Sequence, residues 1–177
     1  MSANKYTGGG LRDGQFKLSD GETYDVEAVV EAGGAIEQTD IEVVGDDERK
    51  GTFSSNRIEA LTIVANAITF DVIQAITGNS VSSSETGAEV ALGTDDELNP
   101  PYVEFRAQTT ARNSDDESEA LITKTWHKVQ VKSVLVTQAG EAEFKVEMEA
   151  IAIPTDEDIE SVALDSKRVA TLSVQAV

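Results

Sequence analysis

Apolar and polar residues alternate along several stretches of the chain. In TYDVEAVVE, every second residue from Tyr24 to Val30 is apolar, and the residues between them are mostly acidic. The same period appears in YVEFRAQTT, where Val103, Phe105 and Ala107 alternate with polar residues. A period of two is typical of strands with one buried face. We therefore expect these stretches, and RVATLSVQA near the end of the chain, to be strands.

The segment RIEALTIVANAI has a different pattern, because its apolar residues fall on both faces of an extended chain. Leu61 and Ile63 lie on one face, whereas Ile58, Ala60 and Val64 lie on the other. Strands that are covered on both sides have such near-continuous apolar runs. We expect this segment to be a strand covered on each side.

The segment KVQVKSVLVTQAGEAEFKVEMEAIAI predicts a β-hairpin. A two-residue turn at Ala139-Gly140 gives a register in which the apolar pairs share one face and an ion pair lies on the other. The opposed residues are then Leu135 and Phe144, Val131 and Met148, Val129 and Ala150, and Lys132 and Glu147. Because Ala-Gly is not a preferred turn dipeptide, a neighbouring bulged turn is the alternative.

One helix is expected in ITFDVIQAITGN. Thr69 can cap its first turn, Asp71 suits the positive end of its dipole, and Gly78 suits a left-handed terminator. Phe70 and Ile73 share a face with Ile76 or Thr77, which predicts an apolar side against the core. A second, short helix is expected after Pro154 in TDEDIES, where the acidic residues would favour its N-terminus.

Together these elements predict a mainly β fold, a β-sandwich or β-barrel of about six or seven strands with one flanking helix. Residues 22–177 are expected to form this single domain, and the glycine-rich residues 1–21 a flexible N-terminal arm. Two long inter-strand loops are expected at 33–57 and 78–101. Loops of this length in a compact domain are usually functional or disordered.

The charge of the chain limits its partners. Fourteen Lys and Arg residues against 33 Asp and Glu residues give a formal net charge of −19. Tight binding to nucleic acid or to an anionic membrane depends on basic clusters, which the sequence lacks, so we expect neither. Adaptation to high salt is an alternative reason for the acidity. No secretory signal or apolar run long enough to span a membrane is seen.

Three Asp-Asp-Glu triplets are the most conspicuous candidates for chemistry. Their contiguous acids do not match the alternating oxygen ligands of a calcium loop, so we expect solvated charge in loops. The nine residues are Asp46, Asp47, Glu48, Asp95, Asp96, Glu97, Asp115, Asp116 and Glu117. The single His127 and the neighbouring Trp126 are expected to support packing at a sheet edge or an interface. No catalytic, metal-binding or cofactor-binding residue is predicted, because no motif assembles such a site.

The order of these features resembles the major tail proteins, or tail tube proteins, of long-tailed bacteriophages. A glycine-rich arm and a strand precede a long acidic loop and RIEALTIVANAI; then follow TFDVIQAITGN, a second long loop through NPPYVEFRA, and the hairpin that ends AIAIP. The resemblance covers residues 22–177. It implies a β-sandwich with a flanking helix, six subunits that join their sheets into a ring around an inner barrel, and rings that stack into a hollow tube.

The resemblance also implies partners and contact residues. The expected partners are further copies of the chain, the tape-measure, tail-terminator and baseplate or distal-tail proteins, and double-stranded DNA that passes without specific binding; no membrane is involved. The expected location is the virion tail, assembled in the host cytoplasm. The arm and one long loop reach neighbouring rings, which makes ring-stacking candidates of Tyr6, Gly8, Gly9, Gly10 and Leu11 in the arm and of Ser82, Ser83, Ser84 and Glu85 in the second loop.

The acidity suits such a tube. Duplex DNA carries one charge per about 1.7 Å, so a basic lining would hold it at many points, whereas an acidic lining would let it slide. The triplet residues are therefore candidates for the lumen or for solvated loops. The alternatives are the inner tube of a related bacterial injection machine, an acidic β-sandwich that acts as a binding or surface module, and, as a third class, an enzyme.

Overall fold

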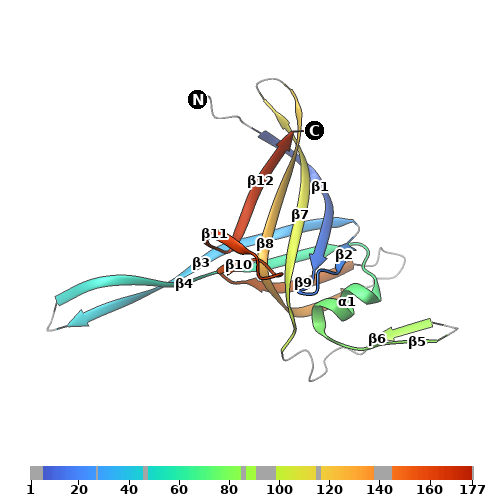
Figure 1. The fold of residues 1–177 in the computed structure, drawn as a ribbon, viewed down its shortest axis with the longest axis horizontal. Helices are drawn as coiled ribbons and strands as arrows, with labels where there is room; N and C mark the ends of the chain where they lie inside the picture. Colours follow the sequence, from blue (N-terminus) through green and yellow to red (C-terminus); the bar gives the residue numbers. More distant parts are fainter. Residues whose placement is uncertain are drawn as a thin grey trace.

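In the computed structural model, residues 6–26, 28–45, 48–84, 87–90, 99–114, 117–137 and 145–176 are described. They form twelve β-strands and one α-helix (Figure 1). A mainly β fold with one helix is therefore confirmed. More strands are present than the predicted six or seven, because part of the expected arm and both expected loops contain strands.

The elements follow one another along the chain in this order: β1 (Tyr6–Lys17), β2 (Thr23–Val26), β3 (Val29–Gly45), β4 (Glu48–Ala65), α1 (Phe70–Thr77), β5 (Val81–Ser84), β6 (Gly87–Val90), β7 (Tyr102–Asn113), β8 (Glu119–Thr137), β9 (Lys145–Ala152), β10 (Thr155–Glu157), β11 (Ala163–Arg168) and β12 (Ala170–Ala176).

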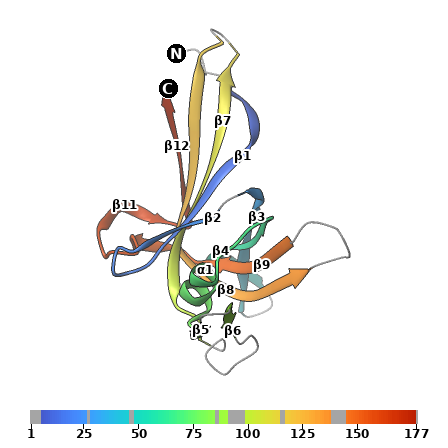
Figure 2. The same ribbon diagram turned by 90° about the vertical axis from the view of Figure 1, so that its right-hand side faces the viewer.

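Eight of these strands form one antiparallel sheet with the order β2-β1-β7-β8-β9-β4-β3, and β12 pairs with β8. The 19-residue strand β8 belongs to two parts of this sheet: its first half pairs with β7 and β12, and its second half with β9. Figures 1 and 2 show β1, β7 and β12 running across the direction of β3, β4 and β9. The two parts therefore face each other like the layers of a sandwich.

A row of aromatic residues crosses the first part of the sheet. Phe16, Phe105 and Trp126 lie in register on β1, β7 and β8. Their ring centroids are 4.7 Å apart between the phenylalanines and 5.5 Å apart between Phe105 and Trp126. All three side chains are fully buried in one cluster with apolar residues of the second part, such as Ile63 and Met148. This cluster is the core that holds the two parts together.

The predicted helix is confirmed almost residue for residue. The Thr69 side chain accepts a hydrogen bond from the Val72 backbone N–H, and Gly78 ends the helix with φ at 82°. Such a positive φ is readily adopted by glycine, which has no Cβ. Ile73 and Ile76 are buried as expected, but Phe70 is 43 % exposed and does not share their apolar face.

The predicted flexible arm is wrong for residues 6–17. These residues form β1, which pairs with both β2 and β7 and buries Phe16. Gly14 allows close packing rather than a flexible backbone, because a Cβ at this position would lie 2.6 Å from Val29 Cγ2. Residues 1–5 lie outside the described residues.

The expected loop 33–57 is also wrong, because residues 33–45 and 48–57 belong to β3 and β4, which pair with each other in a long hairpin. Its glycines allow a close approach: a Cβ on Gly34 would lie 1.6 Å from the Ala60 carbonyl oxygen. The region 78–101 contains the short hairpin of β5 and β6, and residues 85–86 and 91–98 within it are outside the described part.

Two strand predictions need correction. TYDVEAVVE is not one strand: β2 ends at Val26, Ala28 has φ at 53°, and the alternation changes face, so that Val29 is buried whereas Val30 is 57 % exposed. RIEALTIVANAI is strand as predicted only up to Ala65, and it is buried mainly on one face, because Ala60 is exposed.

The hairpin of β8 and β9 is confirmed, but its predicted register is wrong. Val131 pairs with Ala150 rather than with Met148, and Leu135 pairs with Glu147. A bulge between Val131 and Ser133 shifts the ladder, and the proposed turn at 139–140 lies outside the described residues.

The second helix is wrong, because TDEDIES begins with strand β10 and then turns. The Asp158 carboxylate accepts hydrogen bonds from the backbone N–H groups of Glu160 and Val162, at 3.0 and 2.8 Å. A short acidic side chain that caps its own turn in this way competes with helix formation.

Candidate functional site

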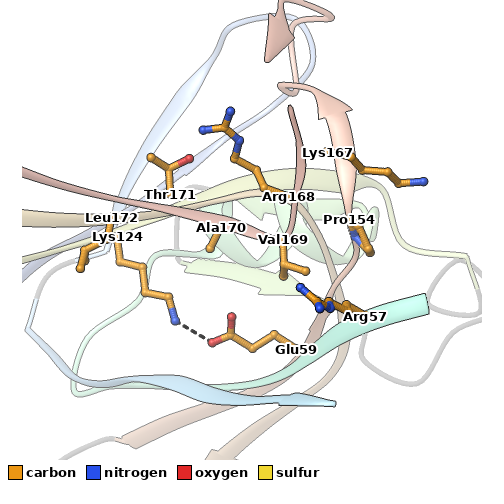
Figure 3. Close-up of a pocket in the computed structure, with 10 residues that line it drawn as sticks. All are labelled: Arg57, Glu59, Lys124, Pro154, Lys167, Arg168, Val169, Ala170, Thr171 and Leu172. Atoms are coloured by element: carbon orange, nitrogen blue, oxygen red, sulfur yellow. Dashed lines mark hydrogen bonds and ion pairs between the residues drawn. The ribbon is translucent and has the colours of Figure 1, made fainter. Parts of the chain in front are cut away.

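A cavity of about 540 Å³ opens between β4, β8, β11 and β12 (Figure 3). Four of the ten residues that line it are basic and one is acidic, although the whole chain has more than twice as many acidic as basic residues. The lining residues are Arg57, Glu59, Lys124, Pro154, Lys167, Arg168, Val169, Ala170, Thr171 and Leu172. The cavity therefore gathers basic side chains, of which Lys124 is paired with Glu59 and Arg168 lies 4.0 Å from Asp165.

Glu59 lies at the inner wall of the cavity with no exposed surface. It is in register with Ala152 on β9, and its position on β4 faces inward, as do those of Leu61 and Ile63. Its Oε1 accepts a hydrogen bond from Lys124 Nζ at 2.7 Å, and this ammonium also lies 4.4 Å from the centroid of the Trp126 ring. Its Oε2 has no hydrogen-bond partner among the described residues. The cavity wall therefore holds a buried acceptor that lacks a donor.

The opposite wall of the cavity combines charge with an open strand edge. Lys167 and Arg168 end β11, and Figure 3 shows their side chains extending outward, away from Glu59. The adjoining strand β12 pairs only with β8 within the described residues, so its other edge has free backbone groups. Leu172 on this edge strand is 66 % exposed. An extended peptide can pair with such an edge.

A hydrogen-bonded relay of three side chains connects β7, β8 and β12. His127 Nδ1 lies 3.1 Å from Glu104 Oε2, and His127 Nε2 lies 2.8 Å from Thr171 Oγ1. Arg106 donates to the other carboxylate oxygen of Glu104, with Nη2 at 2.8 Å. The order of groups matches a nucleophile, base and acid, but Glu104 and His127 are both buried between strands. The arrangement fastens the edge strand β12 to β8 through His127 and, through Glu104, links it to β7.

The environment of Glu104 favours its ionised form. Burial by itself raises the pKa of this carboxyl group, but the hydrogen bond with His127 and the charge and hydrogen bond of Arg106 outweigh burial. The pKa of Glu104 therefore lies below its ordinary value. An ionised carboxylate keeps the imidazole of His127 in place.

His127 and Trp126 were expected to support packing at a sheet edge or an interface. They lie within β8 instead, with Trp126 in the core and His127 bonded to the edge strand. Sequence reasoning missed both the basic cavity and the relay. The one available signal is a charged residue at an inward position of an alternating strand, as Glu59 is beside Leu61.

The two groups of ring-stacking candidates lie at opposite ends of the molecule (Figures 1 and 2). Residues Tyr6 to Leu11 form the first half of β1, where Tyr6 pairs with Asn113 of β7. Ser82, Ser83 and Ser84 form β5 and pair with β6, whereas Glu85 lies outside the described residues. The structure does not bring these two groups together.

The acidic triplets were expected in loops, and two of their nine acids are among the described residues. Glu48 begins β4, and Glu117 is exposed with φ at 59°. The other seven acids, Asp46, Asp47, Asp95, Asp96, Glu97, Asp115 and Asp116, lie outside the described residues.

Among the residues that the structure describes, no group of three or more His, Asp or Glu side chains could hold a metal ion. No helix in the same part of the chain has the length and apolar character that a membrane span requires. A scan against models of known protein families found no match, and a search of curated proteins found no significantly similar sequence.

Proposed function

We propose that this chain is a structural virion protein that assembles with copies of itself into stacked hexameric rings. The rings form the tail tube of a bacteriophage, a conduit for double-stranded DNA with an acidic, non-adhesive lumen. The observation that carries this proposal is the long ribbon of β3 and β4, whose outer edges have no partner strand among the described residues.

The ribbon extends well beyond the rest of the sheet (Figure 1). Strands β3 and β4 pair with each other up to Gly45 and Glu48, but β9 covers β4 only from Glu59 to Ala65. Within the described residues, the segments 36–45 and 48–58 therefore form a two-stranded ribbon with both outer edges unpaired. An isolated two-stranded hairpin is at best marginally stable in water. Contact with neighbouring copies would stabilise it.

The open strand edges, and the positions of the two groups of stacking candidates, also suit a ring that stacks on other rings. β3 and β12 both have an unpaired edge within the described part of the chain, and different edges that meet between copies give a head-to-tail contact that can close into a ring. The two groups of stacking candidates lie at opposite ends, where contacts with the ring above and the ring below would be made.

The distribution of charge fits a conduit for DNA. Six copies of −19 give −114 per ring, and four of the 14 basic residues line one cavity. A wall with few accessible cations cannot hold a duplex through its phosphates. Tape-measure, tail-terminator and baseplate proteins are the further partners that this proposal implies.

Electron microscopy of the purified, concentrated protein tests the proposal. We expect rings or tubes with a central channel. A protein that stays monomeric at every concentration and salt condition would instead favour an acidic binding or surface module. The inner tube of a bacterial injection machine would also give tubes; neighbouring tape-measure, terminator and baseplate genes would identify the phage.

A further inference from the structure

We infer that the open edge of β12 pairs with the same edge of a second copy of this chain, in an antiparallel register that places Ser173 opposite the partner's Ser173. The contact joins the main sheets of two copies across a two-fold axis. It does not depend on the proposed tube, because the free chain can pair in this way whatever it goes on to build. In the proposed tube, the pairing would have to open before β12 could contact the β3 edge of a neighbour in the ring.

The strand β12 lies at the margin of the main sheet. It pairs with β8 in unbroken register from Ala170 to Ala176, and its other edge has no partner strand among the described residues. Figures 1 and 2 both show β12 at the outside of the part of the sheet that it forms with β1, β7 and β8. The edge that faces away from β8 is therefore open to another extended strand.

This edge lacks the features that usually prevent strands of different copies from pairing. Edge strands are commonly protected by charged side chains, proline, bulges or short length. The sequence of β12, ATLSVQA, has no charged residue and no proline, although the whole chain has a net charge of −19. The edge strand β2 has only four residues, one of them Asp25, and the edge strand β3 carries several acids, such as Glu31. Two copies therefore meet with the least repulsion at β12.

The apolar side chains of β12 would cover one another in the two-fold pair. Leu172 and Val174 lie on one face of the strand and are 66 % and 46 % exposed. Pairing about Ser173 places Leu172 opposite the partner's Val174, and the reverse on the other side of the axis. The resulting cluster adjoins Ile122 of β8, with which Val174 is in register. The contact therefore removes exposed apolar surface from water in both copies.

The polar face of β12 holds the strand in the extended form that pairing needs. Nε2 of His127 lies 2.8 Å from Thr171 Oγ1, and Ser173 Oγ donates to the Thr123 carbonyl oxygen at 3.4 Å. A strand that is already fixed loses little conformational freedom when it binds. On this face the register places Thr171 opposite the partner's Gln175, so neutral polar groups meet and no like charges do.

A single cysteine tests the register, because the sequence contains none. Residues directly opposite each other in an antiparallel pair have Cα atoms about 4.5–5.5 Å apart, which a disulfide can span. We expect Ser173→Cys to form a covalent dimer in the presence of oxidised glutathione. The matched control is Gln175→Cys, which is exposed on the same face but lies opposite the partner's Thr171 rather than opposite itself. We expect it to form about tenfold less of the covalent dimer.

A charge at the two-fold axis tests the same contact without a covalent bond. Ser173→Lys and Ser173→Asp each place like charges directly opposite each other, so we expect each variant alone to raise the dissociation constant of the dimer about fivefold or more in sedimentation equilibrium. We expect an equimolar mixture of the two variants to recover the dimer. General repulsion would move the two variants in opposite directions, because one makes the chain less negative and the other more negative. The control Gln175→Lys should dimerise like the wild type.

Both experiments use the protein that stays in solution after any tubes have been sedimented, so the dimer is measured apart from the proposed function. Because one strand edge buries little surface, we expect the dimer in concentrated solution and the monomer on dilution. Equal cross-linking of the two cysteine variants, cross-linking of neither, or no recovery on mixing would overturn the contact, even if tubes form. Cross-linking at position 173 from a protein that forms no tubes would support the contact while the proposed function fails.

Discussion

At the scale of single residues, Glu59 and Lys124 form an ion pair whose two side chains are buried to different extents. Glu59 has no exposed surface, whereas the Lys124 side chain retains 35 % of its exposure. Loss of the lysine would leave a buried carboxylate without its counter-ion, but loss of the carboxylate would leave an ammonium that can reach water. The two partners therefore contribute differently to the stability of the fold.

We expect Lys124→Met to lower the free energy of unfolding by about 3 kcal/mol and Glu59→Gln by only about 1 kcal/mol. Urea denaturation of the two variants and the wild type at neutral pH measures this difference. Equal losses in the two variants would contradict the unequal roles that the burial of the two partners implies.

Glu104 should make stability depend on pH. Its pKa in the folded protein lies below the ordinary value of 4.5, so the unfolded chain binds the proton more tightly. Its stabilising contribution is therefore complete above the unfolded value and is lost as the pH falls through the folded value. Glu104→Gln removes this contribution, and we expect it to cost about 2 kcal/mol at pH 7.

The measurement is urea denaturation of the wild type and of Glu104→Gln across the acid range. We expect the difference in unfolding free energy to shrink as the pH falls below the ordinary carboxyl value of 4.5 and the wild-type carboxylate becomes protonated. A difference that stays constant with pH would contradict an ionised Glu104 in the relay with His127.

Among the helices and strands, the limits of α1 could be predicted from local sequence signals. The pairing of strands far apart in the sequence could not. The limits of α1 follow from Thr69 and Gly78, whose effects act within one turn of the chain. The register of β8 and β9 depends instead on a bulge near Lys132, which the apolar pattern does not encode. The ribbon of β3 and β4 was missed because glycine and acidic residues indicate loops when the partner strand is unknown.

The basic cavity could not be predicted from the sequence, because it also depends on long-range strand pairing. Arg57, Lys124 and Arg168 come from three strands far apart in the sequence, and only the fold of the sheet brings them around one cavity. Glu117, by contrast, lies in a connection that its local composition predicts, between β7 and β8, whereas Glu48 begins β4.

Removal of the ribbon should separate folding from assembly. In a variant whose residues 37–58 are replaced by Asn-Gly, a type I′ turn joins Ile36 to Glu59, which already lie opposite each other. The core cluster lies outside the deleted segment, so we expect a cooperatively folded monomer. We also expect no tubes. Electron microscopy that shows normal tubes from this variant would contradict the role assigned to the ribbon.

At the scale of the whole molecule, charge opposes the association of copies. Each copy has a net charge of −19, and long-range repulsion between copies is screened by salt. We therefore expect sedimentation velocity at a fixed protein concentration to show more assembled protein at about 0.5 M NaCl than at about 0.02 M, because the screening length falls from roughly 20 Å to 4 Å. Assembly that is greatest at low salt would mean that attraction between opposite charges dominates association.

The decisive measurement is a high-resolution electron cryomicroscopy structure of the assembled protein. We expect stacked rings around an open channel whose wall carries Asp and Glu side chains, with the basic cavity turned away from the channel. A channel lined by Lys and Arg, or an assembly without a channel, would contradict this expectation.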